Sequence, residues 1–507
     1  MKTLKYILLL SFVAVMFSAC SDSFLNTEPT SSITTDRLQN PAVDKEQVLI
    51  SQVGGLYSWL MQYNTMNLNT VRHTDFGVYN IFITTDLMNT DMLMNTSNYG
   101  WYYNCYDFSD RPSYEYTDNF MYWNFCYRLI YNANRIIELF SEEEADLDLL
   151  RLKGQALAMR AYAYYYLVQL YQHTYVGHQN EPAVPLVLET STMDELRSNP
   201  RATVEVIYEQ MEKDLLAAYD NIEGYTRTDK NQLNQQVVAG LLARVYLNME
   251  NGTEAVKYAK LARAGYTPSI TQWDYTNRTL GGFMNYAEPD WMWAIITTAQ
   301  SRIVTSGIVN PISHLGSMSY GYTTAGQMQK MIDVKLLNSI PTSDIRGNAF
   351  ARTATNALGY PIPLHSNLKF GPYQVGSDEN QNDYPLMRAS EMYLIEAEGH
   401  MLSGNNTEAQ NVLYEFAITR DPAYTKSTST GAALRAEIYW QRRVELWGEG
   451  FSYFDHKRLK LPIERTYAGT NHRGDALFDH PAEGDVFRFR IPRQEMINNP
   501  GIESNNP

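Results

Sequence analysis

Residues 243–268 read ARVYLNMENGTEAVKYAKLARAGYTP and carry the pattern that decides the fold. Ala243 and Ala255 stand 12 positions apart, and Pro268 follows 13 positions later. Residues 397–422 read AEGHMLSGNNTEAQNVLYEFAITRDP, and they repeat this spacing with Ala397, Ala409 and Pro422. Small residues at such positions let two helices approach closely, and a proline ends the second helix. The two stretches therefore predict two helix pairs of one design.

The turn inside each stretch supports this pairing. Both turns, NGTEA at 251–255 and NNTEA at 405–409, place a threonine before a glutamate. We expect Thr253 and Thr407 to cap the second helix, with each glutamate in its first turn. The pattern is that of a tetratricopeptide helix pair. Because the two copies are 154 residues apart, they are not expected to form one continuous solenoid.

Helical patterning covers most of the chain beyond residue 40. Residues 151–172 place apolar side chains along one stripe at helical spacing. We expect an all-α dominated fold with helical pairs within about 118–265 and 383–462. Residues 266–382 are rich in Gly, Pro, Ser, Thr and Asn, which predicts a loop-rich insert carrying short strands. Loops of this kind carry function more often than the scaffold does.

Composition bounds the function. The chain has 507 residues, 44% of them hydrophobic, which indicates an ordered globular protein and not a disordered one. Its net charge is −15 and its pI is about 5.1. No compact basic patch is visible in the sequence, so nucleic-acid binding is disfavoured.

The first twenty residues predict the compartment. Two lysines precede an apolar stretch at 6–17, which has the length of a signal peptide and is short for a membrane span. Ser18-Ala19-Cys20 then resembles a bacterial lipobox, so we expect a signal peptide at 1–19, an acylated Cys20 and a polar tether over 20–40. An ordinary secretory signal is the alternative. Two other cysteines, Cys105 and Cys126, are compatible with a disulfide or with two buried thiols.

Sequence motifs for catalysis or cofactor binding are missing. The chain has no phosphate-binding glycine loop, dinucleotide fingerprint, nucleophile elbow or zinc signature. We therefore expect no cofactor, no metal and no enzyme activity. Paired carboxylates remain available among the 56 acidic residues, so a secreted glycoside hydrolase stays open as a less favoured alternative.

Clustered aromatic residues suggest a binding site instead. Sugar rings have apolar faces and polar rims, so their sites combine flat aromatic side chains with polar ones. The stretch at 98–103 supplies this mixture, and we expect a glycan site that includes Asn98, Trp101, Tyr102 and Tyr103. Trp273, Trp291, Tyr320 and Tyr322 are further candidates. The competing interpretation places such aromatic residues in the core, and for Trp291 an inward-facing strand position is favoured.

The C-terminal third carries a specific resemblance. Residues 442–459, RRVELWGEGFSYFDHKRL, resemble the late signature of the SusD/RagB family of outer-membrane nutrient-binding lipoproteins. Residues 384–398, YPLMRASEMYLIEAE, are similar to a helical pair of that family, and residues 158–162 and 491–501 also agree. We expect the arginines and glutamates of 442–459 to form structural ion pairs and no catalytic site.

The resemblance implies a fold and a function. The fold would be a single SusD-like domain over 20–507 with four tetratricopeptide-like helix pairs. The protein would capture oligosaccharides on the cell surface, hang from the outer membrane by its lipid, and feed a SusC-like TonB-dependent transporter. In starch-binding relatives an Asp and an aromatic loop hold the glycan, which points here to Asp86 and Trp101. Some relatives look like peptide binders, so a peptide-capturing RagB-like homologue is the main alternative.

Overall fold

Helices make up most of the regular secondary structure in the described residues, as expected from the sequence. The computed structural model describes residues 45–507 except 65, 67–70, 97, 112, 141–145, 270–272, 274–282, 318–320, 326–327, 356–360 and 372–379. Residues 1–49 form one unit, of which only the start of helix α4 (Lys45–Trp59) is described. Ile50–Pro507 forms the second unit, and all that follows concerns it.

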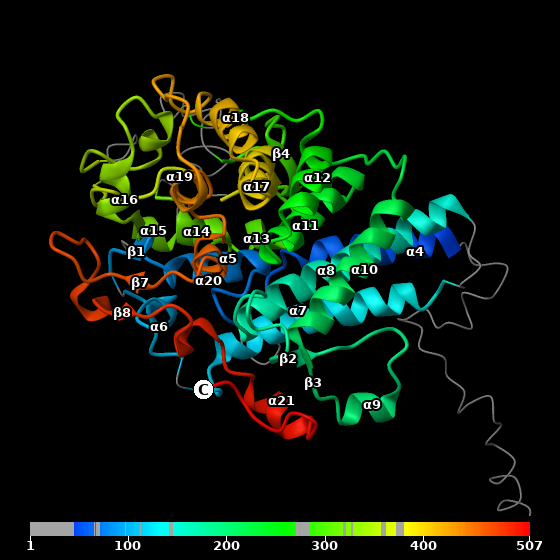
Figure 1. The fold of residues 1–507 in the computed structure, drawn as a ribbon. Coiled ribbons are helices and arrows are strands. Elements are labelled where there is room, and N and C mark those ends of the chain that lie inside the picture. The colour runs from blue at the N-terminus through cyan, green and yellow to red at the C-terminus, as the bar shows by residue number, and fades with distance from the viewer. Residues whose placement is uncertain are drawn as a thin grey trace, which may run out of the picture. The chain divides into compact units, whose positions relative to one another are not determined.

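An array of helices runs through this unit (Figure 1). Neighbours in the array pack against each other in chain order. Its members are α7 (Thr117–Ile137), α8 (Leu147–Tyr171), α10 (Val204–Asn221), α11 (Gln235–Asn248), α12 (Gly252–Arg263), α17 (Ala389–Leu402), α18 (Asn406–Ala417) and α19 (Gly431–Glu445). Three successive packed pairs can be traced, α8 with α10, α11 with α12, and α17 with α18. The fourth, α19 with α20 (Ser452–Arg458), is joined by the ion pair of Arg442 and Asp455 at 2.9 Å.

The alanines of the sequence repeat are packing points. Ala255 on α12 and Ala409 on α18 are completely buried. The expected threonine caps are wrong, because each helix starts earlier than the pattern indicated. Helix α12 begins at Gly252 and is capped by the side chain of Asn251, which accepts a hydrogen bond from the Glu254 N–H at 3.3 Å. The glutamates do lie in the first turns of α12 and α18.

The two repeat copies meet in space, and the expectation of a discontinuous array is wrong. Helix α12 packs directly on α17, although residues 264–388 separate them in sequence (Figure 1). Two glycines form the junction. A Cβ on Gly252 would lie 2.4 Å from the Gly399 carbonyl oxygen, so only glycine permits this approach. The array therefore continues across the insert, which leaves the array after its second helix pair and returns before the third.

Short elements fill the segment between α12 and α17. They are β4 (Trp291–Ile295), α13 (Arg302–Thr305), α14 (Pro311–Leu315), α15 (Tyr322–Ala325), β5 (Lys330–Ile332), α16 (Val334–Ser339), η2 (Ile345–Ala349) and β6 (Tyr384–Arg388). Strand β4 pairs antiparallel with β6, at the entrance to α17, and β5 pairs antiparallel with β1 (Met92–Met94). The insert is thus tied at one end to the array and at the other to the N-terminal segment.

The remaining elements are short, apart from α5. They are α5 (Val78–Leu87), α6 (Tyr103–Tyr106), β2 (Pro182–Pro185), α9 (Met193–Arg197), β3 (Arg201–Thr203), β7 (Ile463–Glu464), η3 (Gly474–Ala476), β8 (Asp479–His480), η4 (Asp485–Phe487) and α21 (Arg493–Asn498). Strands β2 and β3 pair antiparallel, as do β7 and β8. Within the described part of the chain, Cys105 and Cys126 are free, buried thiols.

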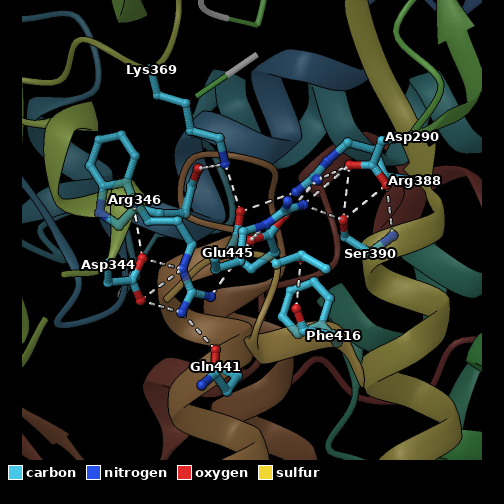
Figure 2. A network of polar contacts seen from close by, with 12 residues as sticks. Asp290, Asp344, Arg346, Lys369, Arg388, Ser390, Phe416, Gln441 and Glu445 are labelled. Atoms are coloured by element: carbon cyan, nitrogen blue, oxygen red, sulfur yellow. Dashed lines mark hydrogen bonds and ion pairs between the residues drawn. The ribbon is translucent and has the colours of Figure 1, made fainter. Parts of the chain in front are cut away.

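A buried network of charges joins the insert to the C-terminal helices (Figure 2). Glu445 on α19 accepts hydrogen bonds from Arg388 at 2.8 Å and Arg420 at 3.0 Å, and all three side chains are fully buried. Burial alone would raise the pKa of Glu445, but the guanidinium groups of Arg420, Arg388 and Arg346 hold it well below its usual range. The expectation that charges in 442–459 form structural ion pairs is confirmed.

Candidate functional site: an aromatic cluster around Trp101

Three segments far apart in sequence bring aromatic side chains together. Tyr99 and Trp101 lie on the loop between β1 and α6, His73 precedes α5, and Tyr322 begins α15 of the insert. The loop is tightly turned, with positive φ angles at Tyr99, Gly100 and Tyr102. Because β1 pairs with β5, which follows α15 in the chain, this loop and the insert are held side by side. We call Tyr99, Trp101, His73 and Tyr322 the Trp101 cluster.

The rings of the Trp101 cluster contact one another in stacked and edge-to-face arrangements, which hold their orientations. His73 stacks on Trp101 with ring centroids 5.1 Å apart, and Tyr322 meets the edge of Trp101 at 6.3 Å. Tyr99 meets Tyr322 edge-on at 5.4 Å. The Tyr322 hydroxyl also hydrogen-bonds the His73 Nδ1. Edge-to-face and offset contacts of this kind are favourable for aromatic rings.

Exposure rises from the bottom of the cluster to its top. Tyr322 is buried, Trp101 is half-buried and Tyr99 is 69% exposed. Asn98 next to Tyr99 is exposed. The Arg72 guanidinium lies 5.6 Å from the Trp101 ring centre and pairs with Asp118 at 3.3 Å. A partly exposed aromatic side chain with a guanidinium group over its ring and polar residues nearby in the chain is suited to a ligand that has an apolar face and a polar rim.

Polar groups also lie on the far side of the loop. The Tyr103 hydroxyl donates to Asp475 at 3.1 Å, and Asp475 pairs with Arg473 at 2.6 Å. Tyr103 itself is half-buried. The structure therefore places Tyr103 at the start of α6, directly after the loop that carries Trp101, with its hydroxyl bonded to the ion pair of Asp475 and Arg473 near η3.

A buried layer supports the cluster from below. His314 stacks on Tyr322 at 4.7 Å, and the ring of Tyr102 meets His314 edge-on at 5.2 Å. Lys330 lies 5.4 Å from the Tyr102 ring, and burial lowers the pKa of Lys330 to about 7. Burial also lowers the pKa of His314 well below its usual value. Tyr102 is therefore a support beneath the cluster, and its buried position corrects the expectation that it contacts a ligand.

Trp273 and Trp291 belong to the core, which corrects their assignment to the site. Both are fully buried and both contact Phe283, at 5.0 Å and 6.3 Å between ring centres. The ammonium group of Lys369 lies 5.3 Å from Trp273, and the Arg420 guanidinium lies 5.8 Å from it. Trp291 lies on β4, where its strand partner is Arg388. We call Trp273, Phe283 and Trp291 the buried aromatic group.

Asp86 is also misplaced by the sequence reasoning. It lies on α5 and is 2% exposed, and its carboxylate accepts the backbone N–H groups of Gly450 at 3.0 Å and Ser452 at 3.3 Å. Burial raises the pKa of Asp86 to about 7, although these two hydrogen bonds oppose the shift. Asp86 thus fixes the turn that enters α20 and does not reach a ligand. Two other expected residues, Tyr320 and Cys20, lie outside the described residues.

Sequence reasoning missed His73 and Arg72. Each is a single residue in a segment without a motif, so no spacing distinguishes it from an ordinary surface residue. The signal that could have found them is their position in the chain. Arg72 and His73 directly precede α5, and the loop with Trp101 comes soon after that helix. Among the residues that the structure describes, no three His, Cys, Asp or Glu side chains gather in a way that would hold a metal ion.

Comparison with known proteins gives a consistent answer over most of the chain. Residues 23–247 match the family model described as starch-binding and associating with the outer membrane. Residues 315–507 match the model of the SusD family. No curated protein matches. None of the helices in the described ranges is long and apolar enough to cross a membrane.

Solved structures share the fold. A SusD-like carbohydrate-binding protein from Bacteroides vulgatus is 23% identical with a TM-score of 0.75, covering 90% of this chain and 97% of that one. A SusD superfamily protein from Bacteroides thetaiotaomicron is 22% identical with a TM-score of 0.74, covering 91% and 99%. A laminarin-binding SusD-like protein is 19% identical with a TM-score of 0.65, again covering 91% and 99%. At these identities the likeness establishes the fold.

Proposed function

The chain belongs to the SusD/RagB family, and from this premise we propose that it captures oligosaccharides at the outer-membrane surface for import. In this proposal the protein is a binding component without catalytic activity. The captured glycan passes to a SusC-like TonB-dependent transporter. The acylated Cys20 holds the chain on the outer membrane, and residues 20–40 act as its tether.

The Trp101 cluster is the observation that carries the proposal. Its half-buried indole is held by His73 and Tyr322, so the plate is preorganised and loses little conformational freedom on binding. Tyr99 extends the aromatic surface outward, Arg72 lies over the Trp101 ring, and the exposed Asn98 precedes Tyr99 in the chain. Polar residues around a flat aromatic surface complement the hydroxyl rim and the C–H face of a sugar ring.

Trp101→Ala tests the binding site. Titration calorimetry with malto-oligosaccharides and laminarin oligosaccharides should show a loss of affinity of roughly tenfold or more, since stacking and area are both removed. Tyr131→Ala is the matched control, because Tyr131 is an exposed aromatic residue on α7, 61% accessible and outside the cluster. Equal glycan affinity of both variants and the parent would place the site elsewhere.

The same experiment separates the alternatives. A peptide-capturing protein would bind peptides and not glycans, and Trp101→Ala would weaken that binding instead. A glycoside hydrolase would release shorter sugars on prolonged incubation with the purified chain, which chromatography of the products detects. Either result would contradict the proposal of a non-catalytic glycan binder.

Membrane attachment and partnership need separate tests. Cys20→Ala should leave the fold intact and remove the protein from the outer-membrane fraction, because acyl chains provide the only anchor in this proposal. Affinity purification of the parent chain from its own cells should co-isolate a large TonB-dependent transporter. Retention of Cys20→Ala in the outer membrane, or purification without the transporter, would contradict the corresponding part of the proposal.

A further inference from the structure

A second pocket lies far along the chain from the Trp101 cluster. It has a volume of about 510 Å³, within the range of about 300–1,000 Å³ that is common for small-molecule sites. Its walls come from the end of α16, the loop at 421–429 that joins α18 to α19, and the outer face of α19. We call it the Trp440 pocket, and it shares no residue with the Trp101 cluster.

Trp440 forms a fixed aromatic wall of this pocket. Its indole is half-buried, and its Nε1 donates to the Ser339 hydroxyl at 2.8 Å. The guanidinium of Arg346 lies 5.6 Å from the ring centre. Arg346 is itself fully buried and held by Asp344 at 2.6 Å and Gln441 at 2.6 Å. The indole is therefore oriented by contacts that do not involve a ligand.

Tyr424 supplies a second ring. It is half-buried and packs against the hydrophobic core of the α17–α18 pair. Burial raises the pKa of Tyr424 to about 12, and the nearby carboxylate of Glu437 adds to this. The phenol hence stays protonated and keeps its O–H as a donor. Two rings on opposite segments, the 421–429 loop and α19, line one cavity.

Short hydroxyl side chains line the rest of the pocket. The loop contributes Thr425, Ser427, Thr428 and Ser429. The loop has a defined conformation, because Ser427 accepts the Ser429 N–H at 3.0 Å and the Ser429 hydroxyl donates to Glu437 at 2.5 Å. Gln441 and the carboxylates of Asp421 and Glu437 complete the polar lining. Such a set offers many donors and acceptors and little aliphatic surface.

The charge of the lining selects among sugars. Asp421 and Glu437 contribute two carboxylates, whereas Lys426 is the lining's cation and its ammonium donates to Asn411 at 2.5 Å. The third carboxylate, Asp344, is matched by the buried Arg346. A cavity with excess negative charge repels uronic acids, sulfated sugars and phosphates. Neutral saccharides carry no charge for these carboxylates to repel.

We propose that the Trp440 pocket is a second saccharide-binding site, which takes one end of a neutral oligosaccharide. The two aromatic side chains contact the sugar faces, and the hydroxyl and carboxylate groups bind the sugar hydroxyls. A peptide is disfavoured, because peptide capture uses a free strand edge or an apolar groove, and no lining residue lies in a described strand. This proposal does not depend on glycan binding at the Trp101 cluster.

A glycan array with neutral and acidic glycans tests the proposal in the Trp101→Ala background, where the first site is disabled. We expect this variant to retain neutral glycans and not acidic ones. The double variant Trp101→Ala/Trp440→Ala should lose at least tenfold of the remaining affinity. Trp123, which is buried on α7, is not a suitable control, so Tyr131→Ala in the same background serves instead.

A second measurement does not need the Trp440 variant to fold. When Trp101→Ala is saturated with a neutral glycan that it still binds, we expect hydrogen–deuterium exchange to slow at residues 421–430. Exchange in α7 should not change. The proposal is overturned if Trp101→Ala retains no glycan, if the double variant binds equally well, or if protection falls outside the pocket. Retention of an oligolysine peptide in place of neutral glycans would also overturn it. Failure of the proposed site at the Trp101 cluster would give a different result, because Trp101→Ala would then bind glycans with the same affinity as the parent chain.

Discussion

Trp291 and Trp101 lie in two regions that sequence alone makes look alike. Both stand in stretches rich in aromatic residues, and both were candidates for contact with a sugar. In the core, the buried aromatic group is covered by cations: Arg388 lies 5.0 Å from Phe283, and Lys369 lies 4.4 Å from it. At the surface, Trp101 is covered by His73 and Arg72 but remains half-exposed.

The two regions differ in the carboxylates that pair with the cations next to the aromatic rings. In the core, the guanidinium of Arg388 pairs with three carboxylates, those of Asp290, Glu445 and Glu449. This ion network covers the rings of the buried aromatic group and keeps them from solvent. Arg72 is partly exposed and, among the residues that the structure describes, pairs with the carboxylate of Asp118 at 3.3 Å. An aromatic residue next to a cation is thus structural where the cation is fully paired, and accessible where the pairing is partial. Two experiments test this distinction and two test the scaffold around it, from the largest expected effect to the smallest.

Glu445→Gln should have the largest effect. It removes the carboxylate that faces Arg388 and Arg420, leaving buried guanidinium charge unbalanced, and breaking such a pair costs about 3–5 kcal/mol. Urea unfolding should show this loss. The surface pair Glu254–Lys257 gives the control, because Glu254→Gln should cost less than about 1 kcal/mol. Similar unfolding curves for the two variants would mean that the network does not seal the core.

Trp291→Ala and Trp101→Ala should separate the two regions directly. Trp291 is fully buried, so its truncation should lower the free energy of unfolding by about 3–5 kcal/mol. Trp101→Ala should cost about 1 kcal/mol or less, because this side chain is partly exposed to water. Thermal melts measure both. A large drop for Trp101→Ala would show that this side chain is structural as well.

Gly252→Ala tests the junction that brings the two repeat copies together. The added methyl group would clash with the Gly399 carbonyl, and overpacking of this kind costs about 1–3 kcal/mol. Gly474→Ala is the matched control, because nothing lies within 4 Å of the added carbon there. Glycan binding should be unchanged in both folded variants. Equal stability of the two would mean that α12 and α17 can separate without loss.

Asp86→Asn should change the pH dependence of stability. The pKa of Asp86 is raised to about 7 in the folded protein, so its contribution is present below about pH 4 and is lost as the pH rises to 7. The slope of unfolding free energy against pH in this window should become more positive in the variant, by at most about 1.4 kcal/mol per pH unit. Identical slopes would contradict the buried position. Glycan affinity should not change, because Asp86 does not reach the ligand.

Much of the scaffold could be predicted from the sequence, because helical periodicity and small-residue spacing are local properties. Ala255 and Ala409 are buried where the pattern placed them. The continuity of the array could not be predicted, because the contact between α12 and α17 depends on where the chain returns after residues 264–388. No local pattern contains that information. The threonine caps failed for a smaller reason, since an asparagine two positions earlier caps α12 first.

The site was predictable only in part. The loop at 98–103 was found because its composition mixes aromatic and polar residues, and the structure brings Trp101 together with Tyr322 as two members of one cluster. Asp86, Trp273 and Trp291 were misplaced because burial depends on tertiary packing, which residue type does not reveal. His73 and Arg72 were missed because they act through neighbours from other segments.

The direct packing of α12 on α17 affects which parts of this protein's sequence can change during evolution. Helices α12 and α17 pack directly on each other, so the array is continuous without the insert, and only part of the insert is bound into the core, through the ion network and the buried aromatic group. The entropy of closing a loop grows only with the logarithm of its length, about 0.6 kcal/mol for each doubling. Changes in the length of the insert's exposed loops should therefore cost the scaffold little, whereas loss of the buried aromatic group or of Arg388 should cost much more. The exposed loops of the insert can therefore change in sequence, and with them the ligand preference, while the contact between Gly252 and Gly399 is retained.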